Sequence, residues 1–210
     1  MTTLKLTQIG NSLGLILPRE VLARLKLQKG DTLFVTDAAN GVLLTPYDPD
    51  LDQQLEIGRE FMHEYRDTFH QVPRHLPPAR QVSWRWLDRR ALELLHDESL
   101  AEHGGASGLR DEGLLDSALA RPLNLVLYGQ PDVADLAAAY GFGLARNHPF
   151  VDGNQRVAFL AVGLFLALNG WRLVASQADA TLTALAVASG QIDEATFARW
   201  LRAHSAPRRP

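Results

Sequence analysis

Residues 148–156 read His-Pro-Phe-Val-Asp-Gly-Asn-Gln-Arg, and the rest of the chain is best interpreted outward from this stretch. An unbroken apolar run from Val157 to Leu168 follows, and its 12 residues suit a buried helix but not the ~20 needed to span a bilayer. The pattern predicts a loop that turns into the N-terminus of a central helix near Gly153 and Asn154. Unpaired backbone N–H groups and the helix dipole make such an end a natural anion site.

The polar side chains of this stretch suit the transfer of part of a nucleotide to a hydroxyl. His148 is predicted to act as the general base that takes a proton from the hydroxyl. Asp152 is predicted to hold a hard divalent metal ion. Asn154 and Arg156 are predicted to donate to phosphate. With the backbone N–H groups included, the expected nucleotide-binding residues are Gly153, Asn154, Gln155 and Arg156.

Each of these residues also has a purely structural interpretation. A His-Pro pair before a helix is often only a turn, and an aspartate there is often an N-cap. The complete set, however, resembles the catalytic-loop signature of the Fic/Doc family, His-x-Phe-x-(Asp/Glu)-(Gly/Ala)-Asn-x-Arg. The resemblance implies that the domain uses ATP and Mg²⁺, and that Phe150 anchors the loop.

Gln155 bears on which part of the nucleotide is transferred. AMP-transferring members of the family carry glycine at this position and a second arginine where this chain has Phe159. The lack of both matches the Doc (death-on-curing) branch, which transfers the terminal phosphate to a threonine of elongation factor Tu. Doc toxins usually carry lysine at the position of Gln155, so AMP transfer and an inert domain stay open as alternatives.

The composition fits a soluble globular protein of one or two domains. Apolar residues make up 46% of the 210 residues and charged residues 21%, which is ordinary for this class. The chain has no cysteine, which excludes disulfides and thiolate metal sites. Its first residues lack the apolar segment of a secretory signal, so we expect a cytoplasmic protein without membrane association.

The first 46 residues predict a small β-rich module. Apolar and polar residues alternate at its start, and two turn signals, Gly-Asn-Ser and Asn-Gly, interrupt the extended segments. A module of this size buries too little surface to be stable alone, so we expect it to dimerise. The predicted elements are strands over 3–9, 13–17, 32–36 and 42–45 and a short helix over 19–25.

The module resembles the AbrB/MazE family of swapped-hairpin DNA-binding proteins. The resemblance rests on residues 6–14 (LTQIGNSLG), 16–18 (ILP) and 27–31 (LQKGD). In that family two chains interleave strands into a homodimer, and the loop around the Gly-Asn-Ser turn contacts operator DNA. Asn11 and Ser12 are equally well explained as turn formers. By resemblance to that family, the residues expected to bind DNA in this chain are Lys5, Gln8, Asn11, Ser12 and Arg19.

Residues 47–72 predict an amphipathic helix with Asp50 as its N-cap. Apolar residues recur at steps of three and four, and the segment carries seven acidic and two basic side chains. The small module offers this apolar face no partner, so we expect it to dock in a groove of the second domain. As a toxin-neutralising helix, the segment would act through Leu55, Phe61, Met62, Tyr65 and Phe69.

Residues 73–82 contain three prolines and predict a linker, and helical patterns fill residues 83–210. A glycine-rich loop over 103–111 and the segment 114–122 resemble the Doc branch, and this resemblance extends over about residues 84–203. His96, His103, Arg110 and Asp111 are expected in core and turn roles, with the rim of the cleft as the alternative. The expected helices are one around Trp86–Leu95, 112–121 ending before Pro122, one from Asp132 or Asp135 to His148, 153–168, 178–189 and 193–204.

Together these patterns predict an α+β multidomain protein. Its parts are a swapped-hairpin dimerisation domain over 1–46, a neutralising helix over 47–72 and an all-α Fic/Doc domain over 83–210. The resemblance implies a toxin fused to its antitoxin, with ATP-dependent phosphoryl transfer to elongation factor Tu, silenced by the helix and autoregulated through DNA binding. The alternatives are an AMP-transferase and a DNA-binding repressor with an inert Fic-like domain. The helix lacks the Ser/Thr-x-x-x-Glu-Gly/Asn inhibitory motif of some Fic proteins, so any block is expected to be steric.

Overall fold

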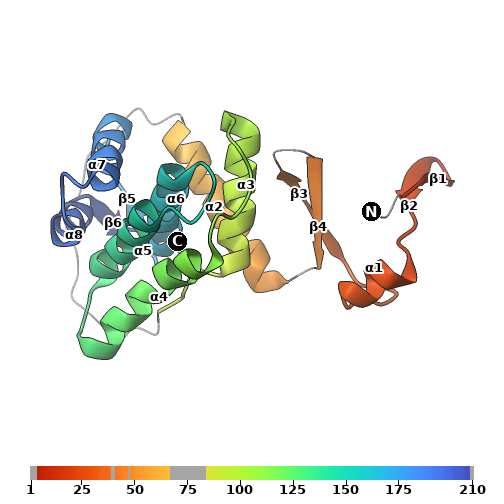
Figure 1. Cartoon of the computed structure of the whole chain (residues 1–210), viewed down its shortest axis with the longest axis horizontal. Helices are drawn as coiled ribbons and strands as arrows, with labels where there is room; N and C mark the ends of the chain where they lie inside the picture. Colours follow the sequence, from red (N-terminus) through yellow and green to blue (C-terminus); the bar gives the residue numbers. More distant parts are fainter. Residues whose placement is uncertain (1–3, 39–40, 47, 67–83, 209–210) are drawn as a thin grey trace.

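The computed structural model describes residues 4–38, 41–46, 48–66 and 84–208. Over these residues the chain forms an N-terminal module of hairpins and a short helix, followed by a helical body (Figure 1). This arrangement confirms the predicted α+β fold class. The predicted linker over 73–82 lies outside the described residues. No described helix is both long enough and apolar enough to cross a membrane.

The N-terminal module consists of two antiparallel hairpins connected through a short helix. The elements lie where the sequence predicts them, with small differences at their ends. The second hairpin lies against the helical body, where its first strand contacts α3 (Figure 1). The hairpins are β1 (Leu6–Ile9) with β2 (Ser12–Leu15) and β3 (Leu33–Ala38) with β4 (Gly41–Pro46), and the helix is α1 (Arg19–Arg24).

One face of the first hairpin is apolar and exposed. Leu6 pairs with Leu15 and Gln8 with Leu13, so the three leucines share a face. The exposed fractions of Leu6 and Leu13 are 66% and 68%. Among the described side chains of the module only Thr36 is buried, so a single chain gives the module no core. The predicted exchange of strands involves a second chain and stays a prediction.

Helix α2 (Pro49–Arg66) begins at a cap two residues earlier than predicted. The carboxylate of Asp48, not that of Asp50, accepts from the first backbone N–H groups, at 3.1 Å from Asp50 N and 3.4 Å from Leu51 N. The predicted cap at Asp50 is therefore wrong, and Asp48 takes that role. Pro49 suits the first helical position because its φ is already helical and its missing N–H is not needed there.

The apolar face of α2 packs into the helical body, which confirms the predicted docking. Leu51 and Leu55 are 1% and 0% exposed and belong to the same core cluster as the apolar side chains of α3, α5 and α6. Phe61 is 7% exposed, and Met62 is half-buried against this cluster. Of the five predicted contact residues, Phe69 and the side chain of Tyr65 lie outside the described structure.

Two glycines let α2 approach its neighbours closely. A Cβ atom at Gly58 of α2 would lie 2.3 Å from Cδ1 of Leu95 on α3. A Cβ atom at Gly163 of α6 would lie 2.2 Å from the ring of Phe61. Each helix thus receives a bulky side chain in a notch that any larger residue would close.

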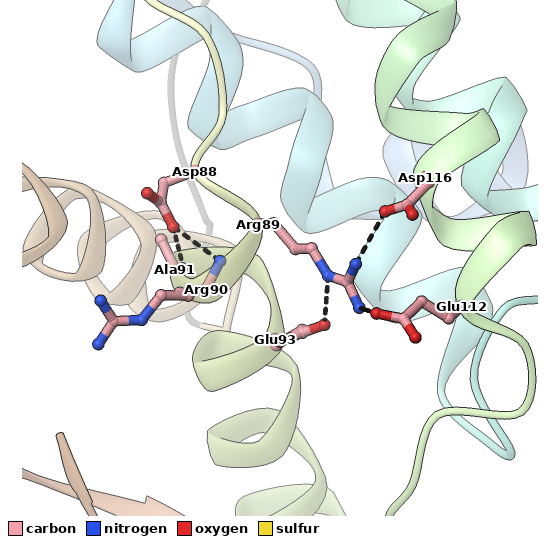
Figure 2. Close-up of polar contacts among 7 residues, drawn as sticks. All are labelled: Asp88, Arg89, Arg90, Ala91, Glu93, Glu112 and Asp116. Carbon is pink, nitrogen blue, oxygen red and sulfur yellow. Dashed lines mark hydrogen bonds and ion pairs between the residues drawn. The ribbon is translucent and has the colours of Figure 1, made fainter. Parts of the chain in front are cut away.

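The helical body is built around α5 (Val133–Asn147) and α6 (Asn154–Leu168), the two described helices with the most buried residues. The other helices are α3 (Arg89–His103), α4 (Glu112–Tyr128), α7 (Gln177–Ser189) and α8 (Glu194–Ala203). Aspartates or a serine cap all of these helices except α6. Figure 2 shows Asp88 capping α3 and Arg89 donating to Glu93, Glu112 and Asp116, a network that ties α3 to α4.

Two predictions for the helical body need correction. Helix α4 does not stop before Pro122 but continues to Tyr128. Leu115, Ala118 and Pro122 form its buried face, and their packing offsets the lost backbone hydrogen bond, which costs about 3 kcal/mol. The domain is also not purely helical, because β5 (Trp171–Leu173) pairs with β6 (Ser205–Pro207). Strands of three residues are too short to show an alternating pattern.

Candidate active site at the start of helix α6

The stretch 148–153 connects the two central helices, and α6 begins at Asn154 as predicted. Gly153, with φ of 70°, precedes the helix, and no side chain caps its first turn. The N–H groups of a first helical turn have no acceptor within the helix, so this end offers donors and positive potential to an anion. The structure therefore has the uncapped helix N-terminus on which the predicted anion site depends, and anion binding there stays a prediction.

His148 lies at the other end of the loop, where it follows the last residue of α5. Its φ of 49° is left-handed, a conformation that costs free energy for a residue with a side chain. Its backbone N–H donates to Leu144 at 3.3 Å, and its Nδ1 lies 3.4 Å from the carbonyl oxygen of Arg146. Such strained residues concentrate at functional sites, which fits the predicted role as general base.

Asn154 uses its side chain within the loop. Its Oδ1 accepts from the N–H of Phe150, and its Nδ2 donates to the carbonyl of Phe150, each at 2.9 Å. The residue is 8% exposed. In this arrangement Asn154 fixes the loop, and the group that it can offer to phosphate is its backbone N–H.

Asp152 is exposed and ionised. Its Oδ1 accepts from the N–H of Gly153 at 2.6 Å, and its Oδ2 lies 3.4 Å from the N–H of Ala106. The hydrogen bond from Gly153 lowers the pKa of Asp152 below the usual range. The described residues contain no group of three or more acidic or histidine side chains that could cage a metal. A single carboxylate completed by phosphate oxygens and water is how Mg²⁺ is often held.

Arg156 lies in the first turn of α6 and reaches back to the glycine-rich loop. Its Nη2 donates to the carbonyl of Gly104 at 2.8 Å. A Cβ atom at Gly105 would lie 3.0 Å from both Nη2 of Arg156 and Oδ2 of Asp152. Only a residue without a side chain brings the backbone this close to both charged groups.

Backbone hydrogen bonds join the same glycine-rich loop to residues 149–151. The N–H of Val151 donates to Gly108 at 2.9 Å, and the N–H of Arg110 donates to Pro149 at 2.7 Å. Asp111 caps α4 and so has the turn role that we expected, whereas the Nη2 of Arg110 donates to the carbonyl of Asn147, next to His148, at 2.9 Å. The loop thus supports the catalytic stretch from outside, a contact that the sequence did not predict.

His96 of α3 lies beneath the catalytic stretch. It is 1% exposed, its Nε2 is 3.0 Å from the carbonyl oxygen of Asp152, and its ring stacks on Phe150 with centroids 4.0 Å apart. Burial lowers the pKa of His96 below the usual range for histidine. The expected core role is confirmed, and the contact with Asp152 is an addition to it.

A cavity of about 410 Å³ opens beside the first turn of α6. Gln155 and Arg156 line one side of it, and Phe61 and Met62 of α2 line another. A larger hollow of about 610 Å³ lies at Asp37, Arg59 and Glu98 and contains none of the predicted catalytic residues. The smaller cavity is therefore the better candidate for a nucleotide, and α2 forms part of its wall.

The predicted DNA-binding residues lie on the N-terminal module, away from this site. All five are exposed. Gly10, with φ of 61°, makes the turn between β1 and β2, and the Nε2 of Gln8 donates to its carbonyl at 3.4 Å. The first hairpin carries Gln8, Asn11 and Ser12, Lys5 precedes it, and Arg19 begins α1.

Residues 86–166 match the Fic/DOC family, and residues 6–52 match the family described as antidote-toxin recognition MazE, bacterial antitoxin. Toxin Doc of Mycolicibacterium smegmatis is 46% identical over 93 residues, which are 43% of this chain and 68% of that toxin. Protein kinase doc of Escherichia phage P1 is 33% identical over 130 residues, 61% of this chain and 94% of that protein. Both predicted resemblances are thereby confirmed, and the chain is an antitoxin–toxin fusion. The chain belongs to the Fic/DOC family and carries a MazE-like antitoxin segment ahead of its Doc-like domain.

Proposed function

We propose that the Doc-like domain transfers the γ-phosphate of ATP to a hydroxyl of a translation factor, with elongation factor Tu as the expected target. The observation that carries this proposal is the uncapped N-terminus of α6 with Asp152 and Arg156 beside it. Similarity to a protein named a kinase over 94% of that protein's length supports phosphoryl transfer.

In the proposed reaction, the phosphates lie at the first turn of α6. Arg156 and the backbone N–H groups of Asn154 and Gln155 donate to phosphate oxygens, whereas the N–H of Gly153 donates to the Asp152 carboxylate. Asp152 holds Mg²⁺, which neutralises phosphate charge when it is bound. The hydroxyl oxygen of the target attacks the γ-phosphorus, the bond to ADP breaks, and His148 takes the hydroxyl proton.

We also propose that α2 restrains the toxin by narrowing the nucleotide cavity. Phe61 and Met62 form part of the cavity wall, and α2 carries them there in the same chain. The block is steric because α2 has no inhibitory glutamate motif. Tethering gives a helix of this kind an effective concentration of order millimolar, so a modest contact suffices.

The N-terminal module is proposed to bind operator DNA as a homodimer. The apolar face formed by Leu6, Leu13 and Leu15 would be buried between two chains. Residues 1–46 carry five basic and three acidic side chains, so phosphate contacts per chain are few. The affinity for DNA should therefore be weak and should change only moderately with salt concentration. DNA binding by the antitoxin segment would place the fusion under its own control.

The test uses the full-length chain with Mg²⁺, purified elongation factor Tu and ATP labelled at the γ- or the α-phosphate. Phe61→Ala opens the cavity and is expected to increase γ-label transfer over the unchanged chain, and adding His148→Ala is expected to abolish it. Leu182→Ala, at an exposed position of α7, is the matched control and should change nothing. Transfer that persists in the His148→Ala variant would contradict the assigned base.

The alternatives have distinct outcomes in the same experiment. Label from the α-phosphate would make the domain an AMP-transferase. Gln155 is the observation that favours an inert domain, because it supplies no positive charge to the phosphates. Label from neither position, in folded protein that still binds operator DNA, would exclude elongation factor Tu as the target and favour the repressor with an inert Fic-like domain.

A further inference from the structure

His96 is a buried polar side chain that the proposed reaction does not use. It lies in the middle of α3, two turns before the glycine-rich loop, and is 1% exposed. A buried imidazole needs hydrogen-bond partners, and unpaired polar groups of this kind are rare. The hydrogen-bond partner of His96 therefore indicates its role, and that partner is the backbone carbonyl of Asp152 in the stretch 148–156.

The hydrogen bond from His96 fixes one particular peptide group. A carbonyl oxygen can only accept, so the Nε2 of His96 donates to the carbonyl of Asp152, over 3.0 Å. In a planar trans peptide the C=O and the following N–H point in opposite directions. Holding the Asp152 carbonyl toward α3 therefore turns the N–H of Gly153 the other way, where it donates to the Asp152 carboxylate at 2.6 Å.

The imidazole is also enclosed by its neighbours. Phe150 stacks on the ring with an interplanar angle of 26°. A Cβ atom at Gly153 would lie 2.8 Å from Nε2, so glycine at this position lets the helix start approach the histidine. His96 thus contacts both ends of the segment that carries Asp152.

We propose that His96 is a positioning residue for the nucleotide and metal site, an inference that rests on the proposed function. By fixing the peptide between Asp152 and Gly153, it sets the direction of the Asp152 carboxylate and of the first donors of α6. Removing a residue that orients a metal ligand without touching the metal typically lowers metal affinity 10- to 100-fold.

Two substitutions separate the donor of His96 from its ring. His96→Gln keeps an N–H donor of similar reach but loses the stacked ring. His96→Phe keeps an aromatic ring against Phe150 but leaves the Asp152 carbonyl without its donor. His96→Leu also lacks a donor and replaces the phenylalanine variant if that one does not fold.

The measurement is the dissociation constant of ADP with and without Mg²⁺, in full-length chains that carry Phe61→Ala, below the melting temperature of each variant. His96→Phe is expected to raise the constant for Mg²⁺·ADP about tenfold and to affect Mg²⁺-free ADP less. His96→Gln is expected to stay close to its parent. A purely structural histidine would leave both constants unchanged in folded protein.

Three outcomes overturn the proposal or its basis. Unchanged Mg²⁺·ADP affinity in the variant without a donor excludes the positioning role of His96 but leaves the proposed function standing. Equal losses in both variants assign the effect to ring packing and not to the hydrogen bond. A parent chain that binds no Mg²⁺·ADP overturns the proposed function and the positioning role with it, whereas a parent that binds but labels no protein overturns only the kinase.

Discussion

The N-terminal hairpins and α2 are neighbours in the antitoxin-like region, yet only α2 packs into a hydrophobic core. Leu6 and Leu13 of the first hairpin are 66% and 68% exposed, whereas Leu51 and Leu55 of α2 are 1% and 0% exposed. Full burial of such a side chain contributes about 1.5–3 kcal/mol. The difference shows that α2 belongs to the hydrophobic core of the Doc-like domain, whereas the leucines of the first hairpin stay exposed in a single chain.

The largest expected effect comes from Leu55→Ala, which removes a core contact of α2. We expect the free energy of unfolding to fall by about 2–5 kcal/mol, because a cavity remains in a tightly packed site. Denaturation followed by tryptophan fluorescence suits this test, since all four tryptophans lie between residues 84 and 200. Leu182→Ala is the control, and its exposed side chain should cost less than about 0.5 kcal/mol. A loss of similar size at both positions would refute the integration of α2.

A second prediction concerns the exposed face of the first hairpin. Leu6→Asp should raise the dissociation constant of the dimer at least about tenfold, or about 1.4 kcal/mol, because it buries an unpaired charge at the proposed interface. Sedimentation over a range of concentrations measures this. Thr7→Asp adds the same charge on the opposite face of the hairpin and should leave the dimer intact. A dimer that tolerates Leu6→Asp would place the interface elsewhere.

The smallest expected effect lies at the polar edge of α2. Arg59 donates to Glu98 of α3 at 2.6 Å, and their side chains are 44% and 12% exposed. Charge reversal at either residue should cost roughly 0.5–1 kcal/mol, a value limited by solvent screening. The double reversal, Arg59→Glu with Glu98→Arg, should recover most of that loss, and high salt should shrink the effect. Additive losses in the double variant would show that the pair does not hold α2.

Elements with strong local signals were predictable from the sequence. The start of α6 follows from Gly153 and the apolar run behind it, and α2 follows from its apolar steps of three and four. The cap of α2 was missed because aspartates stand on both sides of Pro49, and only the structure shows which one accepts the N–H groups. The end of α4 was predicted wrongly because proline usually ends a helix. Here the packing of α4 on its neighbours keeps the helix intact through Pro122 to Tyr128.

The proposed catalytic residues could be identified from the sequence, but the distant residues that contact them could not. His148, Asp152 and Arg156 are close in sequence and follow a recognisable motif. Their partners come from segments far along the chain: His96 reaches Asp152 across 56 positions, and Gly104 receives Arg156 across 52. No local pattern encodes such contacts. The close glycines of the 103–111 loop were the one signal that hinted at a backbone approach.

The packing of α2 in its own chain has a consequence for how the toxin is supplied. β4 ends at Pro46 and α2 begins at Pro49, and Phe61 of the same polypeptide fills the notch at Gly163. Every Doc-like domain is therefore synthesised together with one copy of α2, the helix that we propose restrains it, in a ratio fixed at one to one. Changes in expression level or in the relative lifetimes of two separate proteins cannot shift that ratio, so release would require an event within a single molecule.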